Sequence, residues 1–381
     1  MTGKKILVLG GGFGGAAAAR KARKLLGTEH SVTLVDRDRR TYLCGSFPML
    51  IAGQKDPEKA SRSLGTLDQR GVRFIQAEIQ SIDTNNMNVL TSEGVLDFDF
   101  LIIALGASYD WEAVPGSESS YSFYSIDEAL NLRKRIRSFS KGKILISVSS
   151  IPYKCPPAPF ETAMILDWIF KQKGVRKEID IDVYTPEPAP IRVAGPSASS
   201  QLIKSLTSRG ISLNTGQSIT EVSKDGKEVS ISNGTSKNAD LVITIPVHKP
   251  PNIVFESQLA ELGKWIDVSR DTLETNRENI FAIGDITSVK TNSGFLPKAG
   301  VFAYTAGEVV GTNIAASINH GEKVVFPGKG QCFIAYGGSS AGAIKGDFFA
   351  ADQPKGKRIP PSVKLLKSKE YFEQRWRKFK I

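Results

Sequence analysis

The chain has 381 residues, a length that accommodates two domains, each with its own hydrophobic core. Its 40% hydrophobic and 23% charged residues are typical of a globular protein, and no segment reaches the roughly 18 uncharged apolar residues of a membrane-spanning helix. Most of the net charge of +11 lies in residues 353–381. A basic tail of this kind favours an anionic surface such as a membrane over nucleic acid as the partner, or it serves only to keep the protein soluble.

The N-terminal region predicts a βαβ unit, and a second such unit follows near the middle of the chain. The first is a strand, a glycine turn, a helix and a strand over residues 5–9, 10–15, 16–26 and 31–35. The second is a strand, a helix and a strand over 143–150, 160–172 and 179–184. A hairpin over 89–105, running into a buried strand, and a meander over 221–245 are also predicted. Two such units favour an α/β fold of two Rossmann-like, doubly wound domains with mostly parallel sheets.

The first turn carries a dinucleotide-binding pattern. Gly10, Gly12 and Gly15 form G-x-G-x-x-G between a strand and a helix, which permits a tight turn, close approach of a pyrophosphate and close packing of helix on strand. The helix N-terminus favours phosphate charge. Asp36 ends the next strand, where a carboxylate binds a ribose hydroxyl. The alternative for these residues is a purely structural turn.

Two later segments indicate FAD. The segment DFLIIALG ends at Gly106, and NIFAIGDI contains Gly284 and Asp285. They resemble the second and third flavin motifs of flavoproteins with two dinucleotide domains. This resemblance implies that Asp285 binds the ribityl chain and that the helix start near Lys298 points at the flavin ring. A turn or helix-capping role is the alternative for Asp285.

The second βαβ unit lacks a glycine fingerprint. After its first strand the chain reads IPYKCPPAPFE, and the next glycine is Gly174. Prolines in this loop remove the backbone N–H donors that hold a pyrophosphate. We therefore predict that the electron donor is not a nicotinamide nucleotide.

Cys155 lies in this proline-rich loop, just before a predicted helix. The helix N-terminus and the neighbouring Lys154 are expected to stabilise its thiolate. The chain holds three cysteines and no C-x-x-C, so neither a zinc site nor a disulfide framework is predicted. Inert, buried thiols are the alternative.

The string CPPAPFE, from Cys155 to Glu161, resembles a motif of the sulfide:quinone oxidoreductases and of the flavoprotein subunit of flavocytochrome c sulfide dehydrogenase. The resemblance extends from the glycine turn to Cys332. It implies that Cys332, in QCFIAYG, pairs with Cys155 beside the flavin. Glu161 is then a candidate proton acceptor, with a structural carboxylate in the first helical turn as the alternative.

Cys44, in RTYLCGSFPMLIAG, matches the place of the cysteine that carries the flavin covalently in flavocytochrome c, and a packed thiol near the flavin is the alternative. The chain departs from many sulfide:quinone oxidoreductases because no cysteine lies between Cys44 and Cys155. It also has no C-x-x-C-H haem motif, so a cytochrome c partner would be a separate chain.

After Cys332 the chain has a Gly/Ser-rich stretch, which is followed by an expected Pro/Lys linker. Near the C-terminus, apolar residues recur at helical spacing among lysines and arginines: Leu365, Phe372, Trp376 and Phe379. This stripe favours docking on anionic lipid, which would bring a quinone within reach. Formation of a homo-oligomer and packing on the protein itself are the alternatives.

We expect an FAD-binding domain over 1–108 and 264–322, a second Rossmann-like domain over 109–263 and a C-terminal region over 323–381. The predicted activity is oxidation of sulfide through a Cys155–Cys332 pair, with electrons passing by way of FAD to a quinone or a cytochrome c. The alternatives are a type II NADH:quinone dehydrogenase and a non-catalytic flavoprotein that binds membrane or nucleic acid. The expected location is the cytoplasm, at the inner face of the membrane, because no cleavable signal peptide is predicted.

Overall fold

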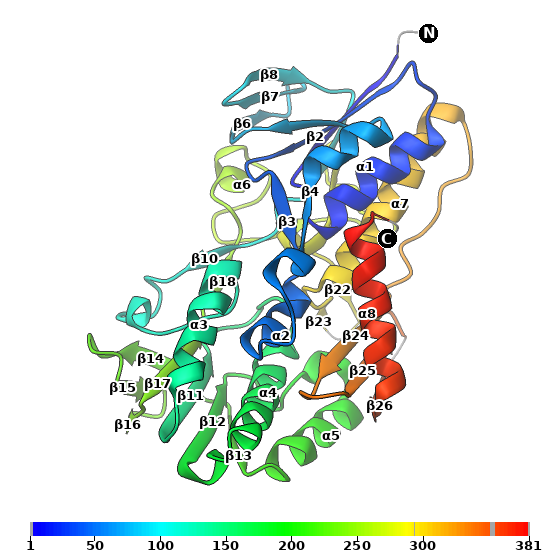
Figure 1. Ribbon diagram of the computed structural model, residues 1–381. Helices are drawn as coiled ribbons and strands as arrows, with labels where there is room; N and C mark the ends of the chain where they lie inside the picture. Colours follow the sequence, from blue (N-terminus) through cyan, green and yellow to red (C-terminus); the bar gives the residue numbers. More distant parts are fainter. Residues whose placement is uncertain (1–2, 293, 351–354, 380–381) are drawn as a thin grey trace.

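The computed structural model describes residues 3–292, 294–350 and 355–379. The predicted domain and tail ranges include residues 1, 2, 293, 351–354, 380 and 381, which lie outside the described part. Figure 1 shows two sheets surrounded by helices, with the C-terminal helix α8 lying along one side of the molecule. The helices are α1 (Phe13–Leu25), α2 (Phe47–Ile51), α3 (Ile126–Ser138), α4 (Ala158–Gln172), α5 (Pro196–Thr207), α6 (Ile253–Glu256), α7 (Gly300–Asn319) and α8 (Val363–Arg377).

The first sheet is parallel and follows the predicted N-terminal unit. Its order is β20 (Ile280–Ala282), β9 (Phe100–Ile103), β1 (Lys5–Leu9), β2 (Ser31–Asp36) and β5 (Arg73–Gln76). The apolar runs of β1 and β9 are buried because helices cover the sheet. Segments far apart in the sequence therefore place their carboxyl ends at one edge.

Helices α1 and α7 pack closely because small residues line their contact. A Cβ on Gly307 would collide with the carbonyl oxygen of Gly14, and one on Gly311 would lie 2.7 Å from that of Ala18. The alanines of α1 are buried in the same contact. This packing holds the start of α7 beside the glycine turn that follows β1.

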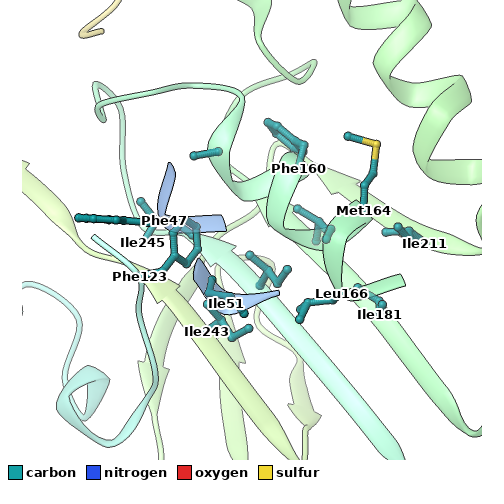
Figure 2. Close-up of a cluster of buried hydrophobic side chains, with 14 of the residues drawn as sticks. Phe47, Ile51, Phe123, Phe160, Met164, Leu166, Ile181, Ile211, Ile243 and Ile245 are labelled. Atoms are coloured by element: carbon teal, nitrogen blue, oxygen red, sulfur yellow. The ribbon is translucent and has the colours of Figure 1, made fainter. Parts of the chain in front are cut away.

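The second sheet is also parallel, with the order β13 (Ile211–Thr215), β12 (Ile179–Thr185), β11 (Gly142–Val148) and β17 (Leu241–Ile245). Figure 2 shows its core, which contains Phe160, Met164 and Leu166 of α4, with Leu166 beside Ile181 of β12. Phe47 and Ile51 of α2 belong to the same core, so a segment that follows β2 packs on the second sheet. The predicted α/β class with two Rossmann-like sheets is confirmed.

Antiparallel strands complete the fold. Two three-stranded sheets match the predicted meanders, β6 (Ile79–Asp83) with β7 (Asn88–Thr91) and β8 (Gly94–Asp97), and β14 (Ile219–Val222) with β15 (Glu228–Ile231) and β16 (Ser236–Asn238). Short pairs are β3 (Arg40–Tyr42) with β4 (Ser61–Ser63), β10 (Ser108–Asp110) with β18 (Val247–Lys249), β19 (Ile266–Asp267) with β21 (Thr287–Ser288), and β22 (Lys290–Thr291) with β23 (Gly294–Phe295).

The C-terminal region contains more regular structure than the sequence indicated. The glycine- and serine-rich stretch contributes β25 (Ala341–Asp347), and the expected Pro/Lys linker contributes β26 (Lys355–Ser362). Together with β24 (Lys329–Ala335) they form an antiparallel sheet. The linker interpretation was wrong because the backbone pairing of β26 with β25 overrides its low strand propensity.

Among the described residues, no helix is both long enough and apolar enough to cross a membrane.

Candidate active site

A cavity of about 830 Å³ lies where the carboxyl ends of the first sheet meet the loop before α4 and the strand β24. This volume is in the range of cofactor and ligand sites. Most of the residues that the sequence singled out line it: Gly10, Gly12, Asp36, Cys44, Gly106, Cys155, Gly284, Asp285 and Cys332. The exceptions are Gly15, Glu161 and Lys298, which do not line the cavity.

The three glycines of the first turn differ in their surroundings. Gly10 has a φ of 98°, and a Cβ there would lie 2.5 Å from the carbonyl oxygen of Ala104. A Cβ on Gly15 would collide with the carbonyl oxygen of Gly10, so this glycine permits close packing of helix on strand. A Cβ on Gly12 would meet no protein atom within 4 Å, which leaves open space at the N-terminus of α1.

Asp36 is held at the end of β2 by backbone donors. The N–H of Gly11 donates to its Oδ2 at 2.6 Å, and the N–H of Asp38 donates to its Oδ1 at 2.9 Å. Burial raises the pKa of Asp36, and these donors oppose the shift. The carboxylate is thus fixed at the cavity wall next to the glycine turn.

Asp285 is the unsatisfied polar group of the cavity. Its Oδ1 atom is buried without a hydrogen-bond partner, and burial raises its pKa against the opposing effect of Lys154 and Lys298. It lies in the short 3-10 turn Gly284–Ile286, where Gly284 has a φ of 77°. A buried carboxylate without a partner indicates a missing donor at this point of the cavity.

Lys298 supports this turn from behind. Its ammonium group donates to the carbonyl oxygens of Asp285 at 2.6 Å and Thr287 at 3.1 Å, and lies 3.4 Å from the ring centroid of Trp265. Burial lowers the pKa of Lys298 to about 8, although the charge of Asp285 raises it. The side chain therefore fixes Asp285, while Ala299 and Gly300 at the start of α7 line the cavity.

These features fit FAD. The open space at Gly12 suits a pyrophosphate at the N-terminus of α1, and the unpartnered Asp285 oxygen suits a hydroxyl donor of a ribityl chain. Asp36 lies where a ribose hydroxyl is expected.

Cys155 and Cys332 line the cavity from two different elements of the fold, the loop before α4 and the strand β24. Cys155 has a φ of 56° and precedes α4; its N–H donates to the carbonyl oxygen of Lys298 at 2.7 Å. Cys332 lies in β24, opposite Ile344 of β25. Both are free thiols in the structure, as is Cys44, whose Sγ is 3.8 Å from the carbonyl oxygen of Tyr42. The structure brings the three cysteines to one cavity.

The expected stabilisation of a Cys155 thiolate is wrong. Burial raises the pKa of Cys155 well above its ordinary value, and the charges of Cys332 and Glu161 raise it further. Burial likewise raises the pKa of Cys332 to about 12, with a contribution from Glu161. Desolvation outweighs the helix N-terminus because the loop before α4 is packed inside the protein.

Glu161 lies behind Cys332 in the first turn of α4. It is 2% exposed, and its Oε1 accepts a hydrogen bond of 2.7 Å from the N–H of Ala335. Burial raises the pKa of Glu161 to about 7, against the lowering effects of Lys369 and of the Ala335 N–H. A carboxyl group with this pKa exchanges protons readily near neutral pH.

The apolar stripe of α8 packs on the protein itself. Trp376 and Phe379 are 1% and 3% exposed, and the guanidinium group of Arg62 lies 4.3 Å and 3.8 Å from their ring centroids. Leu365 and Phe372 are half-buried, and the ring of Phe372 packs 6.4 Å from that of Phe333. Trp376 and Phe379 are therefore covered by protein, as the packing alternative requires, whereas docking on lipid through the half-buried Leu365 and Phe372 stays a prediction.

Sequence reasoning missed two groups at the site. Lys369 and Glu373 of α8 line the cavity as a buried ion pair, although only their spacing of four residues along a helix hinted at one. Tyr109, Tyr124 and His248 form an aromatic cluster beside Lys154, with ring centroids 5.0 to 6.0 Å apart. Nothing in the sequence pattern brought these three side chains together.

Comparison with known proteins identifies the family. Residues 4–146 and 161–308 match the family described as "Pyridine nucleotide-disulphide oxidoreductase". The chain belongs to this family. Its members bind FAD, so the expected cofactor is confirmed and the chain is an FAD-dependent oxidoreductase.

Individual relatives agree with the resemblance found in the sequence. The chain is 26% identical to a sulfide-quinone reductase of Aquifex aeolicus over 99% of its length and 90% of the relative's. It is also 26% identical to the mitochondrial sulfide:quinone oxidoreductase of Mus musculus, over 76% of its length and 66% of the relative's. A type II NADH:quinone oxidoreductase of Staphylococcus aureus is 23% identical over 83% of both chains.

The solved structure of the sulfide:quinone oxidoreductase from Aquifex aeolicus superimposes with a TM-score of 0.85. It covers 99% of this chain and 90% of its own, at 24% identity, so this likeness concerns the fold. The predicted likeness to the sulfide:quinone oxidoreductase family is confirmed. The roles of individual site residues and the domain boundaries stay predictions.

Proposed function

We propose that the protein oxidises sulfide and passes the electrons to a quinone. The observation that carries this proposal is the meeting of Cys155, Cys332 and the Asp285 turn at one cavity. The names of the Aquifex and mouse relatives support sulfide and quinone as substrates. A separate cytochrome c is an alternative acceptor, and an anionic membrane and a homo-oligomer remain candidate partners.

The chemistry begins with a disulfide between Cys155 and Cys332. Hydrosulfide attacks this bond; a new S–S bond forms between the incoming sulfur and Cys155, the old bond breaks, and Cys332 leaves as a thiolate. Because burial raises the pKa of Cys332, this thiolate is poorly stabilised and has strong donor character. After the outer sulfur on Cys155 loses its proton, a new S–S bond between that sulfur and Cys332 releases two electrons, which bound FAD would take up and pass to the acceptor.

Glu161 is the proposed proton acceptor. It is buried, interacts electrostatically with both cysteines and has a pKa of about 7, so it can take the proton of the sulfur attached to Cys155. Ala335 follows Cys332 in β24, and its N–H donates a hydrogen bond that holds the carboxyl group of Glu161 in place. Cys44 remains the candidate covalent attachment point for FAD.

An NADH dehydrogenase is the second candidate, because the Staphylococcus relative has that name. The loop between β11 and α4 argues against it. Its backbone contains Pro152, Pro156, Pro157 and Pro159 where a nucleotide pyrophosphate needs N–H donors. The loop also has no glycine turn of the kind that receives a phosphate at a helix N-terminus.

Anaerobic reduction of the holoprotein separates these functions. Sulfide is expected to bleach the flavin absorbance rapidly, whereas NADH at micromolar concentration should act very slowly. Rapid reduction by NADH and none by sulfide would establish the dehydrogenase instead. Reduction by neither would favour a non-catalytic flavoprotein. Adding a quinone or cytochrome c to the sulfide-reduced protein then identifies the acceptor by the rate at which the absorbance returns.

A further inference from the structure

Lys154 is a cation whose partners are aromatic rings. Its ammonium group lies 4.8 Å from the ring centroid of Tyr109 and 5.9 Å from that of Tyr124. The hydroxyl of Tyr124 donates to the Lys154 carbonyl oxygen at 3.0 Å, which fixes the backbone of the residue before Cys155. The side chain is half-buried and lines the cavity.

The aromatic cluster leaves the charge of Lys154 without an acid beside it. Within residues 3–292, 294–350 and 355–379, no carboxylate lies within 4.0 Å of this ammonium group. His248, which packs behind both tyrosines, is neutral because burial lowers its pKa to about 3. Asp285 acts on Lys154 only at longer range.

Other cations at the cavity are already satisfied. Lys369 pairs with Glu373 and donates to the carbonyl oxygen of Gly45, Arg37 lies 3.7 Å from Asp38, and Arg40 donates to Ser61. Lys154 is different because it combines partial burial, a place on the cavity wall and no acidic partner. Burial lowers the pKa of Lys154, but Cys44, Tyr109 and Asp285 outweigh this effect and raise it, so the ammonium group is charged. A charged ammonium group on the cavity wall with no carboxylate beside it can receive an anion from the cavity.

The identity of the anion follows from what surrounds Lys154. Cys155 is the next residue, and Cys44 is the side chain that acts most strongly on the Lys154 charge. The Sγ of Cys44 lies 3.8 Å from the carbonyl oxygen of Tyr42. Both cysteines line the same cavity as Lys154, and the reacting centre that follows Lys154 is the sulfur of Cys155, so a sulfur anion is the ligand that this position favours.

We propose that Lys154, backed by Tyr109 and Tyr124, forms a subsite that holds a small sulfur anion, hydrosulfide, next to Cys155. Lys154 acts by positioning: it raises the local concentration of the anion and orients it toward the cysteine pair. The hydrosulfide assignment rests on the proposed sulfide oxidation, whereas the anion subsite itself does not.

Two alkylating reagents of similar size test the subsite without sulfide. Iodoacetate is an anion and iodoacetamide is neutral, so the ratio of their rates at one cysteine reports a nearby positive charge and is independent of the thiol pKa. The holoprotein is reduced anaerobically, treated with each reagent, and the modification of Cys155 and Cys44 is followed by mass spectrometry. We expect this ratio to be about tenfold higher in the native protein than in the urea-unfolded chain.

Variants locate the charge. Lys154→Met should bring the ratio down to that of the unfolded chain, Lys154→Arg should keep most of it, and Lys24→Met, at an exposed position of α1, should leave it unchanged. FAD content checks that each variant is folded. An equal ratio in Lys154→Met and wild type, or in native and unfolded wild type, would overturn the proposal.

Thiocyanate titration of the oxidised holoprotein gives a second readout if the thiols react with neither reagent. The flavin absorbance should shift as thiocyanate binds, with an affinity about tenfold weaker in Lys154→Met than in Lys154→Arg. No binding to the wild type, or equal binding to both variants, would contradict the subsite. A protein that binds thiocyanate through Lys154 but is not reduced by sulfide would retain the subsite and refute the proposed function.

Discussion

The position of Glu161 explains the raised pKa of its carboxyl group. Its carboxyl group is buried in the first turn of α4, which disfavours the charged form, while the N–H of Ala335 and the ammonium group of Lys369 oppose this effect. The balance gives a pKa of about 7. A proton acceptor of this kind is half ionised near neutral pH, where a proton can move in either direction.

Hydrogen sulfide itself ionises near neutral pH, so the rate of flavin reduction is compared at a fixed concentration of hydrosulfide. Under this condition the rate should rise as the pH increases through about 7, because Glu161 accepts a proton only when ionised. Glu161→Gln should lower the rate and remove this titration from the pH profile. Glu187→Gln is the matched control, since Glu187 is also buried but pairs with the hydroxyl of Tyr153. A titration near pH 7 that persists in Glu161→Gln would assign it to another group.

Gly12 and Gly15 separate cofactor binding from folding. A Cβ at Gly12 would meet no protein atom within 4 Å, so Gly12→Leu should fold and yet lose FAD, because its side chain enters the space for the pyrophosphate. A side chain at Gly15 collides with the carbonyl oxygen of Gly10, so Gly15→Leu should lower the thermal stability of the apoprotein itself. Flavin absorbance and thermal unfolding measure the two effects. A yellow Gly12→Leu protein would contradict the assigned phosphate position.

At the scale of elements, helix α8 is attached to the site by buried charges. Glu373 accepts hydrogen bonds from Lys369 of the same helix, from Lys55 and from the hydroxyl of Ser46 at 2.8 Å. Ser46 belongs to the 3-10 turn Cys44–Ser46 at the cavity wall. Burial acts to raise the pKa of Glu373, but the two ammonium groups outweigh it and hold the pKa at about 2.

Because the folded protein lowers this pKa from about 4.5, ionised Glu373 stabilises the fold fully above pH 4.5, and the effect is lost as the pH falls toward 2. Glu373→Gln should lower the free energy of unfolding at pH 7 by about 3 kcal/mol, and its difference from wild type should shrink in acid. Urea unfolding at a series of pH values measures this. Glu370→Gln, at an exposed position of α8, should show neither effect; equal behaviour of the two variants would refute the attachment.

Sequence patterns predicted the elements that carry regular periodicity. The glycine turn, the βαβ units and the meanders were found because apolar strands and turn residues alternate there. Strand β26 was missed because its prolines and lysines do not indicate a strand, and only its partner β25 makes it one. The sequence did not decide whether Trp376 and Phe379 face lipid or protein, because an amphipathic stripe has the same sequence pattern whether it faces lipid or the Arg62 side chain.

At the scale of the whole molecule, the topology brings the site residues together from distant parts of the sequence. The cysteines lie before α4 and in β24, and the fold brings both to the cavity that Asp285 and the glycine turn line from the first sheet. Motifs could predict these residues because each has a local signature. Lys369, Tyr109 and His248 could not be predicted, because their roles depend on contacts between segments distant in the sequence.

The cysteine pair is the centre of the account, and stopped-flow reduction of the flavin by sulfide tests it most directly. Cys155→Ser and Cys332→Ser should each keep FAD and lose about a hundredfold or more of the rate, because either change removes the disulfide that hydrosulfide attacks. The double variant should be no slower than the single ones, since the pair acts as a unit. A single variant that is reduced as fast as the wild type would contradict sulfide oxidation through this pair.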